Sequence, residues 1–475
     1  MPQPASTAHT TAPSRDALAR PRPRPGATLA VTAAATAVAL MNYTAPMLTL
    51  PDMAATFGTP ASARAWLLNG TPLGLAVLLL VAGSLADAHG RRRVFLLGTL
   101  ALGLTTALGA FAGSTATFTA ARIAQGAASA AVLAGSLGLL AQAYPAGRDR
   151  IRATGIWGAS VSAGIALGPL LAGALSLVDW RLAYEVLGAA ALVIAGAGAR
   201  LLPTSGAAEE TGAPRPRPDI AGATALGLAL AALLTALTLG RDGWLRPQVG
   251  LLLLASVALT ALFVRVERRS RTPMVDLALL RRPAFLASTL GALFTGLAVI
   301  GLFSVVPALL QGGGPGSGAG AGMSPLGAAW LFVLWSGTAF VVALQTRRLA
   351  GRLSAPYQLA LGFVLSAAGV LALLGGLAGP AGSWPRLLPG LLVAGAGSGL
   401  LNAALPRLAV DSVPPERAAM GSGANNTARY IGSSAGVALM LALATAGPDT
   451  AVLVAAALAL TGAGVTLALG RRQRR

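Results

Sequence analysis

The sequence predicts an all-α membrane protein whose chain crosses the bilayer about fourteen times. Hydrophobic residues make up 55% of the 475 residues and charged residues only 11%, and the mean hydropathy is +0.70. Apolar runs of about twenty residues recur from residue 27 onwards, and a helix of that length crosses a hydrocarbon core of roughly 30 Å. The alternating strands of about ten residues that build a membrane β-barrel do not occur.

The first segment, residues 1–26, is polar and rich in Pro and Arg, which predicts a disordered cytoplasmic tail. The apolar run after it is longer than the core of a cleavable signal, so we interpret it as a retained helix. Gly and Ala are frequent in this run and in the later ones, as in membrane helices that pack closely. The predicted spans cover residues 27–50, 64–86, 94–113, 117–143, 153–176, 182–201, 220–240, 248–266, 284–310, 326–346, 359–379, 386–409, 418–443 and 451–470.

Two long polar segments flank the seventh and eighth spans. This placement predicts two six-helix bundles with an inserted helix pair between them. The predicted parts are an N-terminal bundle at 27–201, a cytoplasmic linker at 202–219, an inserted hairpin at 220–266, a second cytoplasmic linker at 267–283, a C-terminal bundle at 284–470 and a cytoplasmic tail at 471–475.

A weak repeat supports two related halves. The segment Gly351-Arg352-Leu353 follows the tenth span as Gly83-Ser84-Leu85 follows the second, with Ala355 at the position that corresponds to Asp87. Two related halves with a pathway between them are typical of secondary transporters.

The basic residues predict the orientation of the chain. All of them are Arg, and with a cytoplasmic N-terminus 28 of the 35 lie in cytoplasmic segments, whereas 5 lie in outer loops. This asymmetry predicts that both termini are cytoplasmic. The use of Arg without Lys and the bias towards Ala, Gly and Leu are typical of a GC-rich bacterial genome, so the expected location is the bacterial cytoplasmic membrane. The net charge of +20 lies in loops rather than on one basic face, which argues against a nucleic-acid partner.

Several kinds of chemistry are not expected. The chain has no Cys and only two His, in the tail and after the second span, so neither a disulfide nor a His-based metal site is predicted. It contains no G-x4-G-K-[ST] segment, which argues against direct use of ATP. An enzyme in the membrane would need clustered acids, His or an activated nucleophile, and the acids are sparse. We therefore expect neither an enzyme nor a cofactor.

Five segments carry motifs. Gly83 to Arg93, after the second span, matches G-x-L-x-D-x-x-G-R-R. In the fourth span, Arg122-Ile-Ala-Gln125-Gly126 matches R-x-x-Q-G. The fifth span fits G-x8-G-x3-G-P-x2-[GA]-G, and Trp180-Arg181 opens the sixth. The last segment is Pro273-Met274-Val275-Asp276-Leu277, followed by Arg281-Arg282. The glycines and proline of the fifth span are Gly155, Gly164, Gly168, Pro169 and Gly173.

With these motifs the chain resembles the major facilitator superfamily and, within it, the fourteen-helix drug/proton antiporters. The resemblance implies export of hydrophobic small molecules, driven by the proton gradient without a cofactor. It also implies that the fifth-span motif is an antiporter gate. A third implication is that the loop after the second span is a conformational latch that stabilises the outward-facing state. The latch residues are Gly83, Asp87, Gly90, Arg91 and Arg92. For the arginines a positive-inside anchor is the alternative, and for Asp87 a local helix cap.

The chain departs from the family pattern in two places. The first helix often carries an acidic residue, and Asn42 stands at that position. In the sixth span, Leu187 and Ala189 replace the N-x-P that usually follows W-R. The first departure removes a carboxylate and leaves the site of proton coupling open.

The remaining candidates for proton coupling are Arg122 and Glu185. A guanidinium inside a span is costly unless it is paired or faces water. For Arg122 the alternative is that the side chain reaches the outer interface, and its candidate partners are Glu185 and Asp179. Glu185 is the one acid placed within a predicted span, so it suits a proton carrier. Its alternative role is a pair with Arg181 at i, i+4.

Polar and aromatic residues within the spans are candidates for a substrate cavity. Each could instead form an interhelical hydrogen bond or face lipid. Because few acids lie in the spans, we expect neutral, zwitterionic or anionic hydrophobic substrates. The expected partners are such a substrate and the lipid bilayer, and the protein is expected to be a monomer. An exporter or facilitator of a metabolite or lipid without proton coupling is the alternative function. The cavity candidates are Asn42, Asn69, Gln125, Trp157, Phe294, Asn402, Asn426 and Arg429.

Overall fold

The computed structural model describes residues 25–60, 63–144, 148–203, 220–240, 243, 245–270, 279, 281–312, 322–349, 354–377, 383–414 and 418–472. Within these ranges the chain is helical without strands, and 11 helices are long and apolar enough to cross a membrane. Shorter apolar helices cover Thr224–Leu239 and Ala355–Leu371. The predicted all-α membrane fold is confirmed. The count of fourteen spans is consistent with these helices and stays a prediction.

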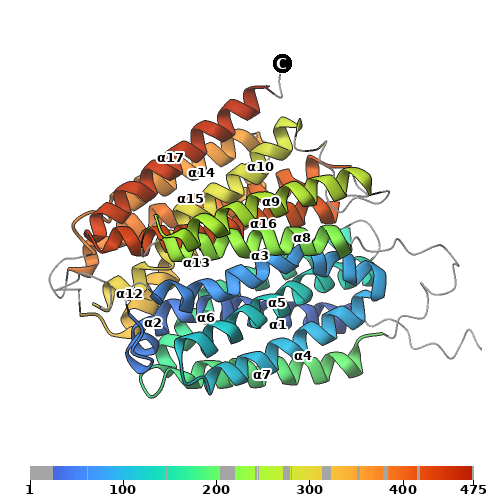
Figure 1. Ribbon diagram of the computed structural model, residues 1–475, viewed down its shortest axis with the longest axis horizontal. Helices are drawn as coiled ribbons and strands as arrows, with labels where there is room; N and C mark the ends of the chain where they lie inside the picture. Colours follow the sequence, from blue (N-terminus) through green and yellow to red (C-terminus); the bar gives the residue numbers. More distant parts are fainter. Residues whose placement is uncertain are drawn as a thin grey trace, which may run out of the picture.

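The N-terminal half consists of seven helices, drawn from blue to green in Figure 1. The first predicted span is two helices, because the chain breaks at Ala45 before Pro46. Proline has no N–H to continue the hydrogen bonding of α1, and it is well suited to the first turn of the next helix. The helices are α1 (Pro25–Thr44), α2 (Pro46–Thr56), α3 (Arg64–His89), α4 (Arg91–Ala110), α5 (Thr115–Ala143), α6 (Arg148–Leu175) and α7 (Arg181–Leu201).

The C-terminal half lies beside it, in yellow to red (Figure 1). Its first span, predicted at 284–310, is not one regular α-helix. A π-helical turn and two short α-helices follow α10 within it. The elements are α10 (Pro283–Phe294), η5 (Thr295–Ile300), α11 (Gly301–Phe303), α12 (Val306–Leu310), α13 (Pro325–Leu349), α14 (Ala355–Leu371), η6 (Trp384–Leu387), α15 (Leu388–Asp411), α16 (Ala418–Ala444) and α17 (Pro448–Arg472).

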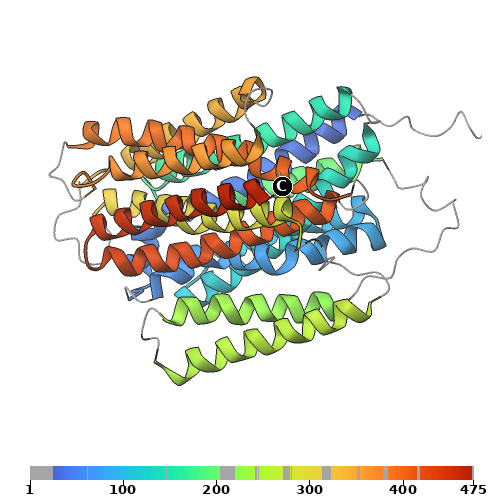
Figure 2. The same cartoon turned by 90° about the horizontal axis from the view of Figure 1, so that it is seen from above.

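The inserted pair forms a separate layer along one side of the molecule (Figure 2). It consists of α8 (Ile220–Leu239) and α9 (Pro247–Arg269), and the Ser256 hydroxyl of α9 donates to the Ala229 carbonyl of α8 at 2.9 Å. Helix α8 contacts both α3 and α16. The pair therefore covers the line along which the two halves meet.

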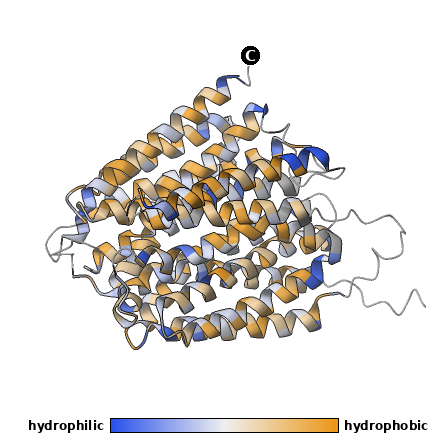
Figure 3. Ribbon diagram, in the orientation of Figure 1, coloured by the Kyte–Doolittle hydropathy of each residue, from blue (hydrophilic) through white to orange (hydrophobic). Residues whose placement is uncertain are grey.

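The hydropathy of the chain follows the layout of a membrane protein. Apolar residues occupy most of the length of the helices, and hydrophilic residues gather towards the helix ends (Figure 3). One of these ends is rich in arginine. There the Arg92 side chain donates to the carbonyls of Ala199 (2.7 Å) and Leu202 (3.2 Å), and Arg150 donates to the Ala141 carbonyl at 2.8 Å. These guanidiniums satisfy carbonyls at the C-terminal ends of α7 and α5, where the helix dipole favours positive charge.

Glycines bring the backbones of α3 and α5 into contact. A Cβ at Gly126 would lie 2.9 Å from the Cα of Gly74 and would collide with the carbonyl oxygen of Thr71. Lipid gives no hydrophobic drive for helices to associate, so dispersion between closely packed backbones takes its place. Gly126, the last residue of the R-x-x-Q-G motif, therefore has a packing role.

Replacing Gly126 by Ala should destabilise the protein by about 1–3 kcal/mol, because backbone atoms cannot move aside as a flexible side chain can. The matched control is Gly158→Ala in α6, where an added Cβ meets no atom within 4 Å. This control should unfold at the wild-type temperature or slightly above it. Thermal unfolding of the two purified variants in detergent provides the comparison. If Gly126→Ala unfolded at the same temperature as wild type, α3 and α5 could move apart without a loss of stability, which would contradict the prediction.

At the opposite end, aromatic rings tie α2 to the start of α7. Trp180 lies 5.5 Å from Phe57 and 5.8 Å from Phe118, ring centre to ring centre, and its Nε1 donates to the Thr56 hydroxyl at 3.1 Å. Asp52 lies two residues beyond the first predicted span. Burial raises the pKa of its carboxyl above the usual 3.8, and the negative charge of Asp179 raises it further.

Because the Asp52 pKa is higher in the folded protein than in the unfolded chain, stability falls as the pH rises through the interval between the two values. Asp52→Asn removes this effect, so at pH 7 the variant should unfold at a higher temperature than wild type. Towards pH 4 the difference should shrink, because the wild-type carboxyl then gains its proton. Thermal unfolding of both proteins across this pH range tests the expectation. A difference that is independent of pH would contradict it.

Candidate functional site

Arg122 lies two turns inside α5 and is completely buried, with 0% of its surface exposed. Its Nη1 donates to the Asn42 carbonyl oxygen (2.8 Å), to Asn42 Oδ1 (2.7 Å) and to Gln125 Oε1 (2.8 Å), and its Nη2 donates to the Tyr43 carbonyl oxygen at 3.4 Å. The guanidinium therefore has several acceptors although it does not reach the surface. The alternative in which Arg122 extends to the outer interface is wrong for this structure.

The break between α1 and α2 supplies one of these acceptors. In an unbroken helix the Asn42 carbonyl would accept from the N–H four residues later, but that residue is Pro46, which has no N–H. The free carbonyl points to Arg122 instead. The Pro46 break thus provides a backbone acceptor at the buried cation.

A second layer of hydrogen bonds orients the two amide side chains. Asn42 Nδ2 donates to the Thr106 hydroxyl at 2.5 Å, and Gln125 Nε2 donates to the Thr105 carbonyl at 3.1 Å. With their N–H groups occupied in this way, both amides turn their oxygens towards Arg122. The cluster joins α1, α4 and α5, and each acceptor that Arg122 uses is neutral.

The sequence left the partner of Arg122 open between Glu185 and Asp179. Neither is among its hydrogen-bond acceptors in the described part of the chain. Asp179 pairs with Arg181 across 4.0 Å, and Glu185 is partly exposed on α7. Asn42, the departure from the family pattern, is instead the main partner. The roles of Arg122 and Glu185 in proton coupling stay predictions.

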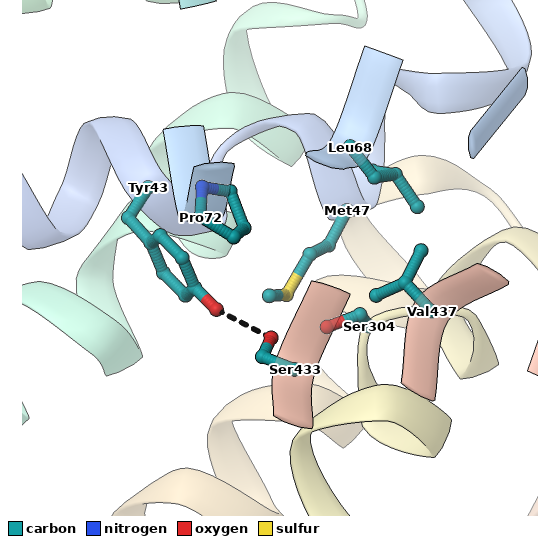
Figure 4. A pocket seen from close by; sticks show the side chains of 7 residues that line it. All are labelled: Tyr43, Met47, Leu68, Pro72, Ser304, Ser433 and Val437. Atoms are coloured by element: carbon teal, nitrogen blue, oxygen red, sulfur yellow. Dashed lines mark hydrogen bonds between the residues drawn. The ribbon is translucent and has the colours of Figure 1, made fainter. Parts of the chain in front are cut away.

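The two halves meet at Tyr43. Its hydroxyl lies 2.9 Å from the Ser433 hydroxyl of α16, and its ring contacts the Tyr430 ring edge-on at 5.8 Å. Nearby, Asn69 Nδ2 of α3 donates to the Ser434 carbonyl at 3.1 Å. Between the halves at this level is a cavity of about 10 Å³, roughly the room of one water molecule. It is lined by Tyr43, Met47, Leu68, Pro72, Ser304, Ser433 and Val437 (Figure 4).

Further contacts between the halves lie towards the end opposite the arginines. Gln311 Nε2, just after α12, donates to the Leu48 carbonyl of α2 at 3.2 Å. A Cβ at Gly173 of α6 would lie 2.9 Å from the Pro325 carbonyl oxygen at the start of α13. The halves are therefore in contact from the level of Tyr43 to this end.

The predicted gate motif lies in α6 and has two packing partners. A Cβ at Gly164 would lie 2.5 Å from the Ala37 carbonyl oxygen, and one at Gly168 would lie 2.7 Å from the Met41 carbonyl oxygen. These two glycines pack α6 on α1 of its own half, whereas Gly173 packs it on α13 of the other half. Gly155 and the buried Pro169 lie in the same helix. A gating role for the motif stays a prediction.

The predicted latch is a one-residue turn. Gly90 ends α3 and precedes α4 with φ of +97°, a conformation that only glycine adopts readily. Arg91 Nη1 donates to the Gly138 carbonyl of α5 at 3.1 Å, and Arg92 binds α7 as described above. Gly83 lies within α3 with open space beside its Cα. The Asp87 side chain and the Gly351–Leu353 echo lie outside the described residues, so a latch between the halves stays a prediction.

The other predicted cavity residues have different surroundings. Trp157 Nε1 donates to the Thr36 hydroxyl within the N-terminal half at 2.9 Å. Phe294 packs against α17 at Gly462, and Asn402 is exposed on α15. Asn426 Oδ1 accepts from Arg429 Nη2 at 2.8 Å. Asn42, Asn69 and Gln125 are buried in the contacts given above.

The sequence did not single out Tyr43, Met47 or Ser433 for the central cavity. A tyrosine, a methionine and a serine in apolar helices carry no distinctive spacing. Pro46, four residues after Asn42, was a usable signal for the carbonyl that Arg122 binds.

Known proteins resemble this chain over most of its length. Residues 32–437 match the family model described as Major Facilitator Superfamily. A probable actinorhodin transporter of Streptomyces coelicolor is 33% identical over 88% of this chain and 72% of its own length. Multidrug resistance protein Stp of Mycobacterium tuberculosis is 32% identical over 82% and 70% of the two chains. Puromycin resistance protein pur8 of Streptomyces alboniger is 32% identical over 90% and 83%.

Asn42→Ala should destabilise the protein by about 2–3 kcal/mol, because it removes a side-chain acceptor from a buried guanidinium. Asn42→Asp keeps an oxygen at this position and adds a charge opposite to that of Arg122. Its unfolding temperature should therefore be higher than that of Asn42→Ala. Asn402→Ala is the matched control, since that asparagine is exposed. Thermal unfolding in detergent orders the four proteins. An Asn42→Ala variant as stable as the control would show that Arg122 does not depend on the amide.

Proposed function

The chain belongs to the major facilitator superfamily, and from this premise we propose that it exports antibiotic-like hydrophobic small molecules across the bacterial cytoplasmic membrane. The observation that supports the proposal is the boundary between the two halves, where the polar Tyr43–Ser433 contact borders a cavity with room for about one water molecule. Relatives named for actinorhodin, puromycin and multidrug resistance support this substrate class. The chain acts as a monomeric transporter rather than an enzyme.

Alternating access is the proposed mechanism. The described contacts between the halves extend from Tyr43 to the end opposite the arginines, and the distribution of arginine makes that end the outer one. Both termini are then cytoplasmic. Contacts of this kind correspond to a closed outer gate. Opening the outer gate would require the polar Tyr43–Ser433 and Gln311–Leu48 pairs to separate. The free energy needed for this is small compared with that of disrupting the packing within one half.

Proton antiport is the proposed source of energy, and Glu185 is the acid proposed to carry the proton. One observation favours the alternative of uncoupled export or facilitation. The acceptors around Arg122 are amides and carbonyls, so the described surroundings of this cation contain no carboxylate partner. The two functions differ in whether substrate movement is accompanied by proton movement.

Everted membrane vesicles that contain the protein distinguish these functions. After acidification of the lumen, addition of puromycin should make the lumen less acidic, because each imported drug molecule is exchanged for a proton. A pH-sensitive dye in the lumen measures this change, and radiolabelled puromycin measures uptake. Glu185→Gln should retain puromycin binding and lose most of the proton release. Vesicles without the protein give the background.

Uptake of puromycin without any change in luminal pH would contradict antiport and support the uncoupled alternative. A normal proton signal in Glu185→Gln would exclude Glu185 as the carrier while leaving antiport in place. Absence of uptake of puromycin and of a panel of other hydrophobic antibiotics would contradict export itself.

A further inference from the structure

Among the described residues, two guanidiniums lie at least five residues from either end of a predicted span, one in each half, and their surroundings differ. Arg122 of the N-terminal half has neutral oxygens at close range on several sides. Arg429 of α16 makes one hydrogen bond to the described residues, from Nη2 to Asn426 Oδ1 at 2.8 Å. Its Nε is buried and has no acceptor, as is also the case for Arg122 Nε, and its guanidinium carbon lies 5.5 Å from the centre of the Tyr430 ring. Because a guanidinium offers five N–H donors, Arg429 keeps most of its capacity unused.

Arg429 faces the meeting line of the halves. Asn426, Arg429 and Ser433 follow one another at helical spacings of three and four residues, so they share a face of α16. The Ser433 hydroxyl of that face contacts the Tyr43 hydroxyl of the other half at 2.9 Å. Ser433 also lines the central cavity with Tyr43 (Figure 4). Arg429 therefore lies one helical turn from the cavity, on its arginine-rich side.

No protein acid balances this charge in the described part of the chain. The acids whose side chains are described form no hydrogen bond or ion pair with Arg429: they are Asp52 in α2, Asp149 in α6, Asp179 and Glu185 before and in α7, Glu267 near the end of α9, Asp411 at the end of α15 and Asp449 at the start of α17. Arg122 donates to the Tyr43 carbonyl, and Arg429 is followed in α16 by Tyr430, whose ring contacts the Tyr43 ring. The two arginines make the electrostatic potential at the cavity positive. Because the surroundings are apolar, they attract a negatively charged ligand more strongly than they would in water.

We propose that Arg429 binds the anionic group of the exported molecule, with Asn426 holding the guanidinium in place. A carboxylate or phenolate accepts two parallel hydrogen bonds from a guanidinium, and this pairing is strong where water is scarce. The closed cavity has room for about one water molecule, so the apolar part of the substrate would contact Met47, Leu68 and Val437 only when the halves separate. The substrates are therefore organic acids with an aromatic or apolar body. The assignment rests on the proposed export function and makes its substrate class definite.

The contrast with Arg122 is what assigns the role to Arg429. At Arg122 the protein itself supplies the acceptors, and the 0% exposure leaves no access for a ligand. Arg429 is only partly buried, and among the described residues it has a single hydrogen-bond acceptor, against the four oxygens around Arg122. A cation left in this condition is costly for the folded protein unless a ligand completes its hydrogen bonds.

Three matched probes test the assignment: 2-naphthoic acid, its uncharged amide 2-naphthamide, and a 2-naphthyl trimethylammonium salt. Uptake of each radiolabelled probe is measured in everted vesicles for wild type, Arg429→Gln, Arg429→Lys and Arg407→Gln. Arg407 is the matched control, because it lies on α15 and donates to Gln358 at 3.0 Å. Arg429→Gln should raise the KM for the acid at least about tenfold, the loss expected for one charged hydrogen-bond pair, and leave the KM for the amide unchanged. Arg429→Lys should recover part of the affinity, and Arg407→Gln should match wild type.

Binding to purified wild-type protein gives a second measurement that needs no variant. In nanodiscs of phosphatidylcholine alone, 2-naphthoic acid should raise the unfolding temperature and 2-naphthamide should raise it less. A parallel series with added phosphatidylglycerol tests whether a lipid phosphate occupies the same site. If phosphatidylglycerol stabilises the protein through Arg429 and the acid does not, the ligand is a lipid headgroup and the assignment is wrong.

Two further results would overturn the proposal. One is an equal KM for the acid in wild type and Arg429→Gln, and the other is a preference of wild type for the cation. A wild-type protein that moves the amide and the cation but not the acid contradicts the substrate class and leaves export in place. A protein that moves none of the three probes and no antibiotic contradicts export, and with it this assignment.

Discussion

The N-terminal half depends on how it holds one buried cation. Arg122 has no exposed surface, and removing its acceptors would leave a charge in an apolar interior. The acceptors come from α1 and α5, and the amide of Asn42 is itself oriented by Thr106 of α4. Three helices are therefore fixed relative to one another by a single guanidinium. The constraint reaches into the backbone, because the Asn42 carbonyl is available only where Pro46 interrupts α1.

Tyr43 connects this cluster to the other half. Its backbone carbonyl accepts from Arg122 at 3.4 Å, while its hydroxyl meets Ser433 of α16 at 2.9 Å. One residue thus touches both the buried cation and the boundary that alternating access would have to open. A ligand at Arg429, one turn along α16, would act on the same boundary. Such a ligand could shift the equilibrium between two states only by binding them unequally, and the Tyr43–Ser433 contact is the place where that difference would arise.

Sequence patterns predicted the parts of this protein that depend on local composition. Twenty-residue apolar runs give the spans because lipid requires them, and the loop predicted after the second span is the turn at Gly90, whose φ is positive. The spacing of charges also indicated that Arg122 and Arg429 lie inside spans. The partners of these arginines could not be predicted in this way. Asn42 and Arg122 are 80 residues apart, and the sequence of one helix does not say which other helix packs against it. The contacts of Met47 and Ser433 at the central cavity follow no pattern that the sequence displays.

Glycine-mediated backbone contacts occur within the halves and also between them, and polar side-chain pairs add to them at the boundary. Within a half, glycines bring backbone onto backbone, as at Gly126 and Gly74 or at Gly296 and Gly432 beside the π-helical turn. Between the halves there is one such backbone approach at Gly173 and Pro325, together with single polar pairs at Tyr43–Ser433, which borders a small cavity, and at Asn69–Ser434. Backbone contacts resist sliding because no rotamer can relieve them, whereas hydroxyl and amide pairs can exchange protein for water or substrate. Two rigid halves joined by exchangeable contacts are the arrangement that alternating access requires.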